Sequence, residues 1–104
     1  MSSEDEVRAT ADRFYAALNK VVNGDAGPMR ALWSQGEDVT TMHPIGGREV
    51  GWTQVRGSWE QVAGMASGGS VTLTDRLLRV IGDVAYELGT EQVDATLGGQ
   101  RIRT

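Results

Sequence analysis

Cysteine is absent from this 104-residue chain, and histidine occurs only once. Without cysteine the protein has no disulfide, no thiolate nucleophile and no thiolate metal site. A single histidine also excludes a zinc site built from several histidines. We therefore expect no bound metal.

Basic charge and long apolar runs are missing as well. The net charge of −4 provides no basic surface for nucleic acid. No run approaches the ~20 apolar residues of a membrane-spanning helix, and the acidic start of the chain, residues 1–6, is unlike a signal peptide. We expect no nucleic-acid partner, no membrane partner and a cytoplasmic location.

Phosphate-binding motifs are lacking too. The pair Gly46-Gly47 has neither the lysine nor the serine or threonine of a P-loop, and no G-x-G-x-x-G follows a predicted strand. We expect no nucleotide and no other cofactor.

Apolar residues recur with helical spacing in three stretches, residues 7–22, 29–33 and 52–66. Each stretch predicts an amphipathic helix. The third contains Gly57 and Gly64, and a glycine inside a helix costs about 1 kcal/mol relative to alanine. These glycines either allow close packing or indicate that the helix ends early.

The spacing of apolar residues changes to two in residues 38–43, which predicts a short strand. The proline that follows cannot donate to a sheet, so the strand should end at His43. The pair Gly46-Gly47 predicts a turn, in which Arg48 and Glu49 form a solvent-exposed pair.

The last third of the chain predicts a three-stranded meander after a loop at residues 67–70. Its strands are expected at 71–81, 84–94 and 101–104, with tight turns between them. Three helices and a mostly antiparallel sheet make one α+β domain over residues 1–104.

Several of these features together resemble a known family. They are the helix with residues 12–19, the strand ending His43-Pro44, the Gly46-Gly47 turn and the helix start Gly51-Trp52. They resemble the SnoaL-like branch of the nuclear transport factor 2 and ketosteroid isomerase superfamily. The resemblance implies a curved sheet wrapped around a long helix as a cone, an internal apolar pocket and a homodimer formed through the sheet. It also implies further strands after Thr104, so we expect the sequence to lack the last strand or strands of the fold.

The chemistry of the ketosteroid isomerases does not transfer with the resemblance. Their catalytic aspartate corresponds to His43, and their helix-1 tyrosine corresponds to Phe14. Tyr15 is one residue away and therefore about 100° around the helix. Their late aspartic acid would fall at or beyond Thr104. What the resemblance still implies is a titratable group, His43, at the mouth of a pocket.

His43 is the first candidate for catalysis because an imidazole can accept or release a proton near neutral pH. The alternative is a structural hydrogen bond to neighbouring backbone. A lone base needs a second polar group, and Tyr15 and Asp94 are the candidates. Tyr15 could instead lie at the surface or in a dimer interface, and Asp94 could simply be solvated.

Large apolar side chains are predicted to line the pocket. Trp52 and Trp59 are seven residues apart, so they share one helix face. The full predicted set is Phe14, Trp33, Met42, Trp52 and Trp59. Packing in the core without any ligand is the alternative for all of them.

The sequence leaves two functions open. One is a cofactor-independent lyase, isomerase or cyclase that moves a proton of a small apolar substrate at His43. The other is a non-catalytic ligand-binding or dimerisation module of the same fold. A second polar group within hydrogen-bonding distance of His43 in an open cavity would favour the enzyme, and a cavity filled by Trp52 and Trp59 would exclude it.

Overall fold

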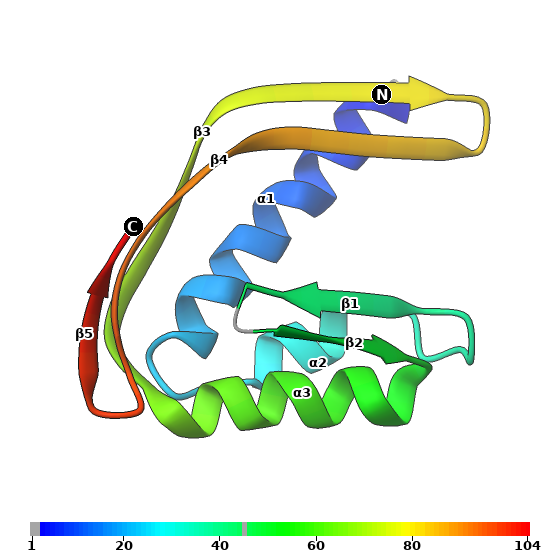
Figure 1. Cartoon of the computed structure of the whole chain (residues 1–104). Helices are drawn as coiled ribbons and strands as arrows, with labels where there is room; N and C mark the ends of the chain where they lie inside the picture. Colours follow the sequence, from blue (N-terminus) through cyan, green and yellow to red (C-terminus); the bar gives the residue numbers. More distant parts are fainter. Residues whose placement is uncertain (1–2, 45) are drawn as a thin grey trace.

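The computed structural model describes residues 3–44 and 46–104, and it consists of helices packed on antiparallel strands (Figure 1). The helices predicted from periodicity are confirmed. In chain order the elements are α1 (Ser3–Val21), α2 (Gly27–Leu32), β1 (Thr40–His43), β2 (Gly46–Val50), α3 (Trp52–Met65), β3 (Ala66–Ile81), β4 (Val84–Leu97) and β5 (Gln100–Arg103).

The strands of the described residues form two separate sheets where one was expected. One has the order β1-β2, and the other has the order β3-β4-β5. The long β3–β4 hairpin bends around α1, while α2, α3 and the β1–β2 hairpin close the opposite side (Figure 1). The predicted α+β class and the three-stranded meander are confirmed. None of the described helices combines the length and hydrophobicity that crossing a membrane requires.

Strand β2 replaces the turn and exposed pair predicted at residues 46–49. Gly46 and Gly47 do have positive φ angles, 111° and 84°, which explains why the local sequence resembles a turn. Both glycines nevertheless belong to β2, in which Gly46 lies opposite His43 and Glu49 lies opposite Thr41. The prediction of a solvent-exposed Glu49 is therefore wrong, because cross-strand pairing turns its side chain inward.

Residues 67–70 belong to β3, so the predicted loop there is also wrong. The pairing of β3 with β4 shifts register within this segment, and such a bulge bends a strand. A Cβ atom on Gly69 would lie 2.6 Å from Cβ of Ala95 and 3.0 Å from Cβ of Val22. Asn23 also binds the Gly69 backbone, accepting from its N–H at 3.1 Å and donating to its carbonyl at 2.8 Å. Gly69 thus serves close packing of the bent strand against the end of α1.

The main core lies between the three helices. Its buried members are Ala17, Val21, Met29, Val55, Trp59 and Ala63. Gly57 and Gly64 lie on α3 away from this core, and a Cβ atom on either would meet nothing within 4 Å. Neither predicted role applies to them, since α3 continues to Met65 and both positions face open space.

Candidate functional site

A cavity of about 350 Å³ lies between α1, β1, α3 and the inner face of the β3–β4 sheet. Its wall is mostly apolar, and it carries two titratable side chains, His43 from β1 and Glu91 from β4. The apolar lining comprises Phe14, Leu18, Val22, Trp33, Met42, Pro44, Trp59, Val62, Val71, Val93 and Leu97. This composition is typical of small-molecule sites.

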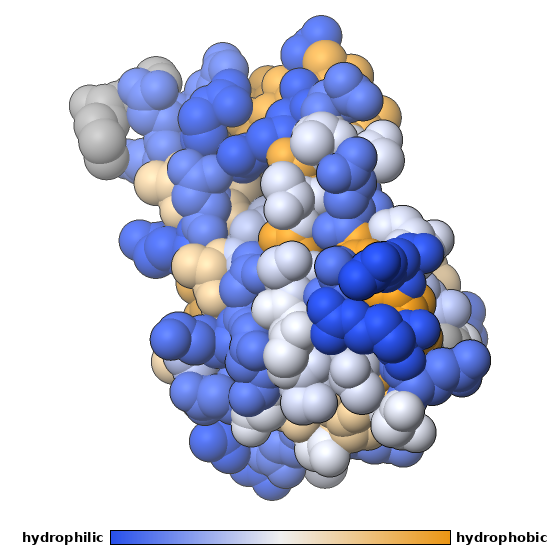
Figure 2. Space-filling view, turned by 90° about the vertical axis from the view of Figure 1, so that its left-hand side faces the viewer, coloured by the Kyte–Doolittle hydropathy of each residue, from blue (hydrophilic) through white to orange (hydrophobic). Residues whose placement is uncertain are grey.

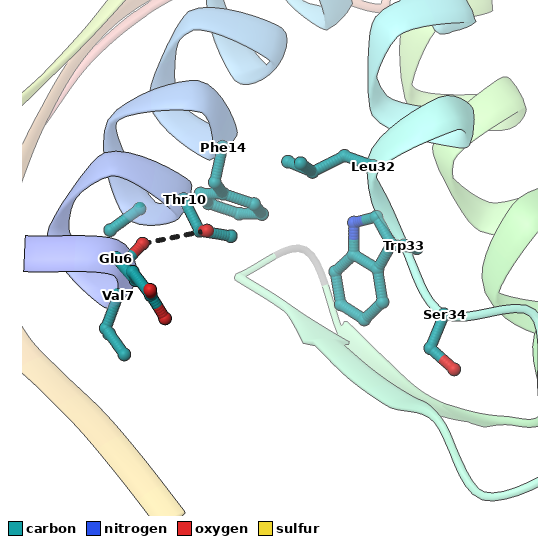
Figure 3. Close-up of a pocket in the computed structure, with 8 residues that line it drawn as sticks. Glu6, Val7, Thr10, Phe14, Leu32, Trp33 and Ser34 are labelled. Carbon is teal, nitrogen blue, oxygen red and sulfur yellow. Dashed lines mark hydrogen bonds between the residues drawn. The ribbon is translucent and has the colours of Figure 1, made fainter. Parts of the chain in front are cut away.

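A wider, shallower groove of about 590 Å³ lies between α1 and the end of α2 (Figure 3). Phe14 and Leu32 project toward one another there from the two helices (Figure 3). Phe14 and Trp33 line both hollows, so they separate the groove from the cavity. The groove has Glu6 as its one titratable residue, whereas both His43 and Glu91 line the cavity, which is therefore the candidate site.

His43 ends β1 with a side chain that is only 10% exposed. Its ring meets the indole of Trp59 edge-on, with the ring centroids 4.7 Å apart. Its Nε2 atom lies 2.9 Å from Oγ of Ser58 on α3. A second polar group therefore lies within hydrogen-bonding distance of the histidine.

The hydrogen bonds of Ser58 determine which nitrogen of His43 carries the proton. The Ser58 hydroxyl donates its one hydrogen to the carbonyl of Val55 at 2.7 Å. Toward His43 it can then only accept, so Nε2 carries the hydrogen in the neutral ring. Nδ1 keeps its lone pair and has no hydrogen-bond partner among the described residues. Nδ1 is thus the basic nitrogen.

This assignment can be checked directly because the chain contains a single histidine. At a pH where the imidazole of His43 is uncharged, we expect ¹⁵N NMR to show the Nε2–H tautomer, since Ser58 accepts that hydrogen. In Ser58→Ala the two tautomers should become mixed. A dominant Nδ1–H tautomer in the wild type, or an unchanged spectrum in Ser58→Ala, would contradict the assignment.

Glu49 places a negative charge beside the same ring. Its Oε1 atom lies 3.7 Å from Nε2 of His43 and accepts a hydrogen bond from the Thr41 hydroxyl at 2.8 Å. The Glu49 side chain is 19% exposed, so solvent screens this charge only partly. The arrangement can stabilise an imidazolium after His43 has accepted a proton.

Sequence reasoning missed both Ser58 and Glu49. For Ser58 a signal was present: it follows Val55 by three residues and precedes Val62 by four, which puts a polar residue on the apolar face of α3. Glu49 carried no comparable signal, because its position depends on the pairing of β2 with β1.

Tyr15, a predicted catalytic residue, contributes through Glu91. Its hydroxyl donates to Oε2 of Glu91 at 2.8 Å, but Tyr15 itself is not part of the cavity lining. Burial and, next, the hydrogen bond to Glu91 raise the pKa of Tyr15 above its ordinary value. The phenol therefore remains a donor at neutral pH.

Comparison with known families identifies the chain. The family model of the SnoaL-like domain matches residues 7–103. The chain belongs to the SnoaL-like family.

Two solved structures share this SnoaL-like fold. A proposed dehydratase of the NTF2-like family from Streptomyces avermitilis superimposes with a TM-score of 0.80 at 23% identity, covering 96% of this chain and 76% of that one. A proposed calcium/calmodulin-dependent protein kinase type II association domain from Thiobacillus denitrificans gives 0.63 at 20% identity, covering 93% and 73%. Curated proteins give no significant match. These likenesses establish the fold of the SnoaL-like domain.

Four of the five predicted pocket residues line the cavity of this SnoaL-like domain, namely Phe14, Trp33, Met42 and Trp59. Met42 is 77% exposed and lies at the mouth. Trp52 does not line it and contacts a separate hollow near Arg30 and Arg56. Trp52 and Trp59 do share a face of α3, but two helical turns separate them by about 10 Å along its axis.

Asp94 lies away from the site, contrary to its predicted role. It forms ion pairs with Arg101 and Arg103 on β5. Side chains alternate along a strand, and Val93 faces the cavity, so its neighbour Asp94 points outward. In the described residues of this SnoaL-like domain, no group of three or more His, Cys, Asp or Glu side chains is arranged to hold a metal ion.

Proposed function

We propose that the cavity binds a small, largely apolar molecule and that His43 moves a proton of that molecule. The observation that carries the proposal is the hydrogen bond of His43 to Ser58, which leaves Nδ1 with a free lone pair on a histidine of the cavity wall. The similarity to a proposed dehydratase of the same fold is compatible with proton transfer but adds only fold-level support.

The proposed step is the removal of a C–H proton next to a carbonyl group. The C–H bond breaks, its proton forms the new Nδ1–H bond, and the electron pair moves to the carbonyl oxygen as an enolate. The Nε2–H group of His43 continues to donate its hydrogen bond to Oγ of Ser58, and the carboxylate of Glu49 faces the resulting imidazolium. Return of the proton to another carbon would give an isomerase, and loss of a neighbouring leaving group would give a lyase.

Hydrogen–deuterium exchange in heavy water tests this step without knowledge of the natural substrate. We would use bicyclic ketones such as 1-indanone and 2-tetralone, which combine an apolar body with an acidic C–H, and follow loss of the α-proton signals by ¹H NMR. The protein should accelerate exchange beyond an equal concentration of free imidazole. Exchange at the imidazole rate across the panel would contradict proton transfer and favour a non-catalytic domain.

We also propose that two copies associate through the outer face of the β3–β4 hairpin. This face exposes large apolar side chains, of which Leu77 lies opposite Leu88 and Ile81 opposite Val84, while Tyr86 lies opposite Arg79. They are Leu77, Ile81, Val84, Tyr86 and Leu88. Hydrophobic surface gathers at the top of the space-filling view, where this hairpin lies (Figure 2). Apolar patches of this kind commonly mark interfaces, and one structural neighbour is described as an association domain.

A charge placed in this face should separate the copies. Leu88 is 57% exposed and lies opposite Leu77, so Leu88→Arg should convert a dimer into a monomer, as measured by size-exclusion chromatography with light scattering. Gln61→Arg, on the exposed surface of α3, is the matched control and should remain dimeric. A monomeric wild type, or a dimeric Leu88→Arg variant, would refute this interface.

A further inference from the structure

Glu91 lines the cavity from the inner face of β4, on the same face as Val93, and it is exposed to solvent at the cavity's open edge. Tyr15 donates to its Oε2 atom at 2.8 Å. Because burial and this hydrogen bond raise the pKa of Tyr15, the phenol keeps its proton and continues to donate. Glu91 is thereby held in a defined position at the edge of the cavity.

Glu91 differs from its neighbours on β4 in having no cationic partner. Glu87 binds Arg76 at 3.0 Å, and Asp94 pairs with two arginines of β5. Within residues 3–44 and 46–104, by contrast, Glu91 makes only the hydrogen bond with Tyr15, and no lysine or arginine lines the cavity. A carboxylate offers about four acceptor positions, so most of those on Glu91 remain available to a ligand.

The charge of the cavity therefore discriminates among ligands. An anion bound there would meet the carboxylate of Glu91, and Glu49 lies behind His43, while no lysine or arginine of the lining would compensate the anion. A cation would instead supply the partner that Glu91 lacks, and a charge-assisted hydrogen bond is stronger than a neutral one.

We propose that Glu91 makes the cavity selective for apolar molecules that carry a protonated amine. The amine hydrogens bind the free acceptor positions of Glu91, while the apolar body contacts the aromatic wall at Phe14, Trp33 and Trp59. A neutral alcohol is a weaker donor to Glu91, and a carboxylate binds most weakly of the three. This specificity concerns the cavity of the proposed function, but it requires binding only and no proton transfer at His43.

Three probes with one carbon skeleton test the selectivity: 4-phenylbutylamine, 4-phenylbutan-1-ol and 4-phenylbutyrate. Dissociation constants would be measured at neutral pH and low ionic strength by isothermal titration calorimetry and by quenching of tryptophan fluorescence. We expect the amine to bind about tenfold more tightly than the carboxylate, with the alcohol between them. The preference for the amine should weaken as salt is added.

Two variants of equal charge locate the origin of the preference. Glu91→Gln keeps an oxygen acceptor for Tyr15, so we expect it to fold normally and to bind the amine and the carboxylate within about threefold of one another. Asp94→Asn removes the same charge three residues away, outside the cavity, and should keep the preference of the wild type. Thermal melting and circular dichroism would confirm that both variants are folded.

Several results would overturn the proposal. They are equal binding of amine and carboxylate by the wild type, failure of all three probes to bind, an unchanged preference in Glu91→Gln, or the same loss of preference in Asp94→Asn. A His43→Gln variant separates this proposal from proton transfer, because it should lose the exchange of ketone protons and keep the preference for the amine. Loss of ketone exchange alone would thus leave the role of Glu91 standing.

Discussion

His43→Gln is expected to reduce the exchange of ketone α-protons by about 10²–10⁴-fold, the range that a positioned general base contributes. Glutamine can still bond to the Ser58 hydroxyl, but an amide nitrogen has no lone pair able to accept the substrate proton. The rate constant for loss of the α-proton NMR signal measures the effect. Because the change removes the base and leaves the apolar lining in place, binding of the ketone should change far less than the exchange rate.

The matched control for this experiment is Trp52→Phe. It alters a tryptophan of α3, the helix that carries Ser58 and Trp59, at a position outside the cavity, and it should exchange ketone protons at the wild-type rate. A His43→Gln variant that retains the wild-type rate would remove His43 from the mechanism. A Trp52→Phe variant with the same loss would indicate that the exchange rate responds to general damage to the fold and not to loss of the base.

Gly69→Ala is expected to destabilise the protein by about 3 kcal/mol, toward the upper end of what overpacking costs. The added Cβ atom would lie 2.6 Å from Cβ of Ala95 and 3.0 Å from Cβ of Val22. Both of these atoms are attached directly to backbone, so neither can rotate away, and the strand and α1 must separate. For a chain of this size the melting temperature should fall by about 10–20 °C.

Gly64→Ala tests whether this effect comes from the position or from the loss of glycine. Nothing lies within 4 Å of a Cβ atom at Gly64, which is exposed inside α3. The substitution should therefore stabilise the protein by about 0.5–1 kcal/mol through helix propensity. Urea denaturation followed by circular dichroism would measure both variants, and a Gly69→Ala variant as stable as wild type would show that β3 does not need this close approach.

The sequence predicted the site in part. The position of His43 at a strand end followed from the proline after it. Helical spacing placed Phe14, Trp33 and Trp59 on apolar helix faces, and the resemblance to the family implied that these faces line a pocket. Of the two predicted polar partners of His43, Asp94 lies outside the cavity, and Tyr15 is connected to the cavity only through its hydrogen bond to Glu91. The observed partners, Ser58 and Glu49, lie on segments that contact β1 only after folding, so residue spacing along the chain does not reveal them.

Glycine was the main source of error in the fold. Gly46-Gly47 and Gly68-Gly69 both have the local composition of loops, yet both lie in strands. A glycine in a strand can allow an irregular pairing within a hairpin, or it can allow a neighbouring element to approach the backbone closely. Which of these applies depends on what packs against it, and a single sequence does not contain that information.

By itself, the sequence determined the α+β class, the three helices, the meander of β3, β4 and β5, and the placement of one titratable residue where β1 ends. These features depend on local periodicity and on residues that stop an element, which short-range steric and hydrophobic effects dictate. Tertiary structure alone decided that β2 pairs with β1, that Ser58 and Glu49 meet His43, and that Glu91 enters the cavity while Asp94 does not. Each of these depends on the register between segments distant in sequence, because a shift of one residue in a strand reverses which side chains face the cavity.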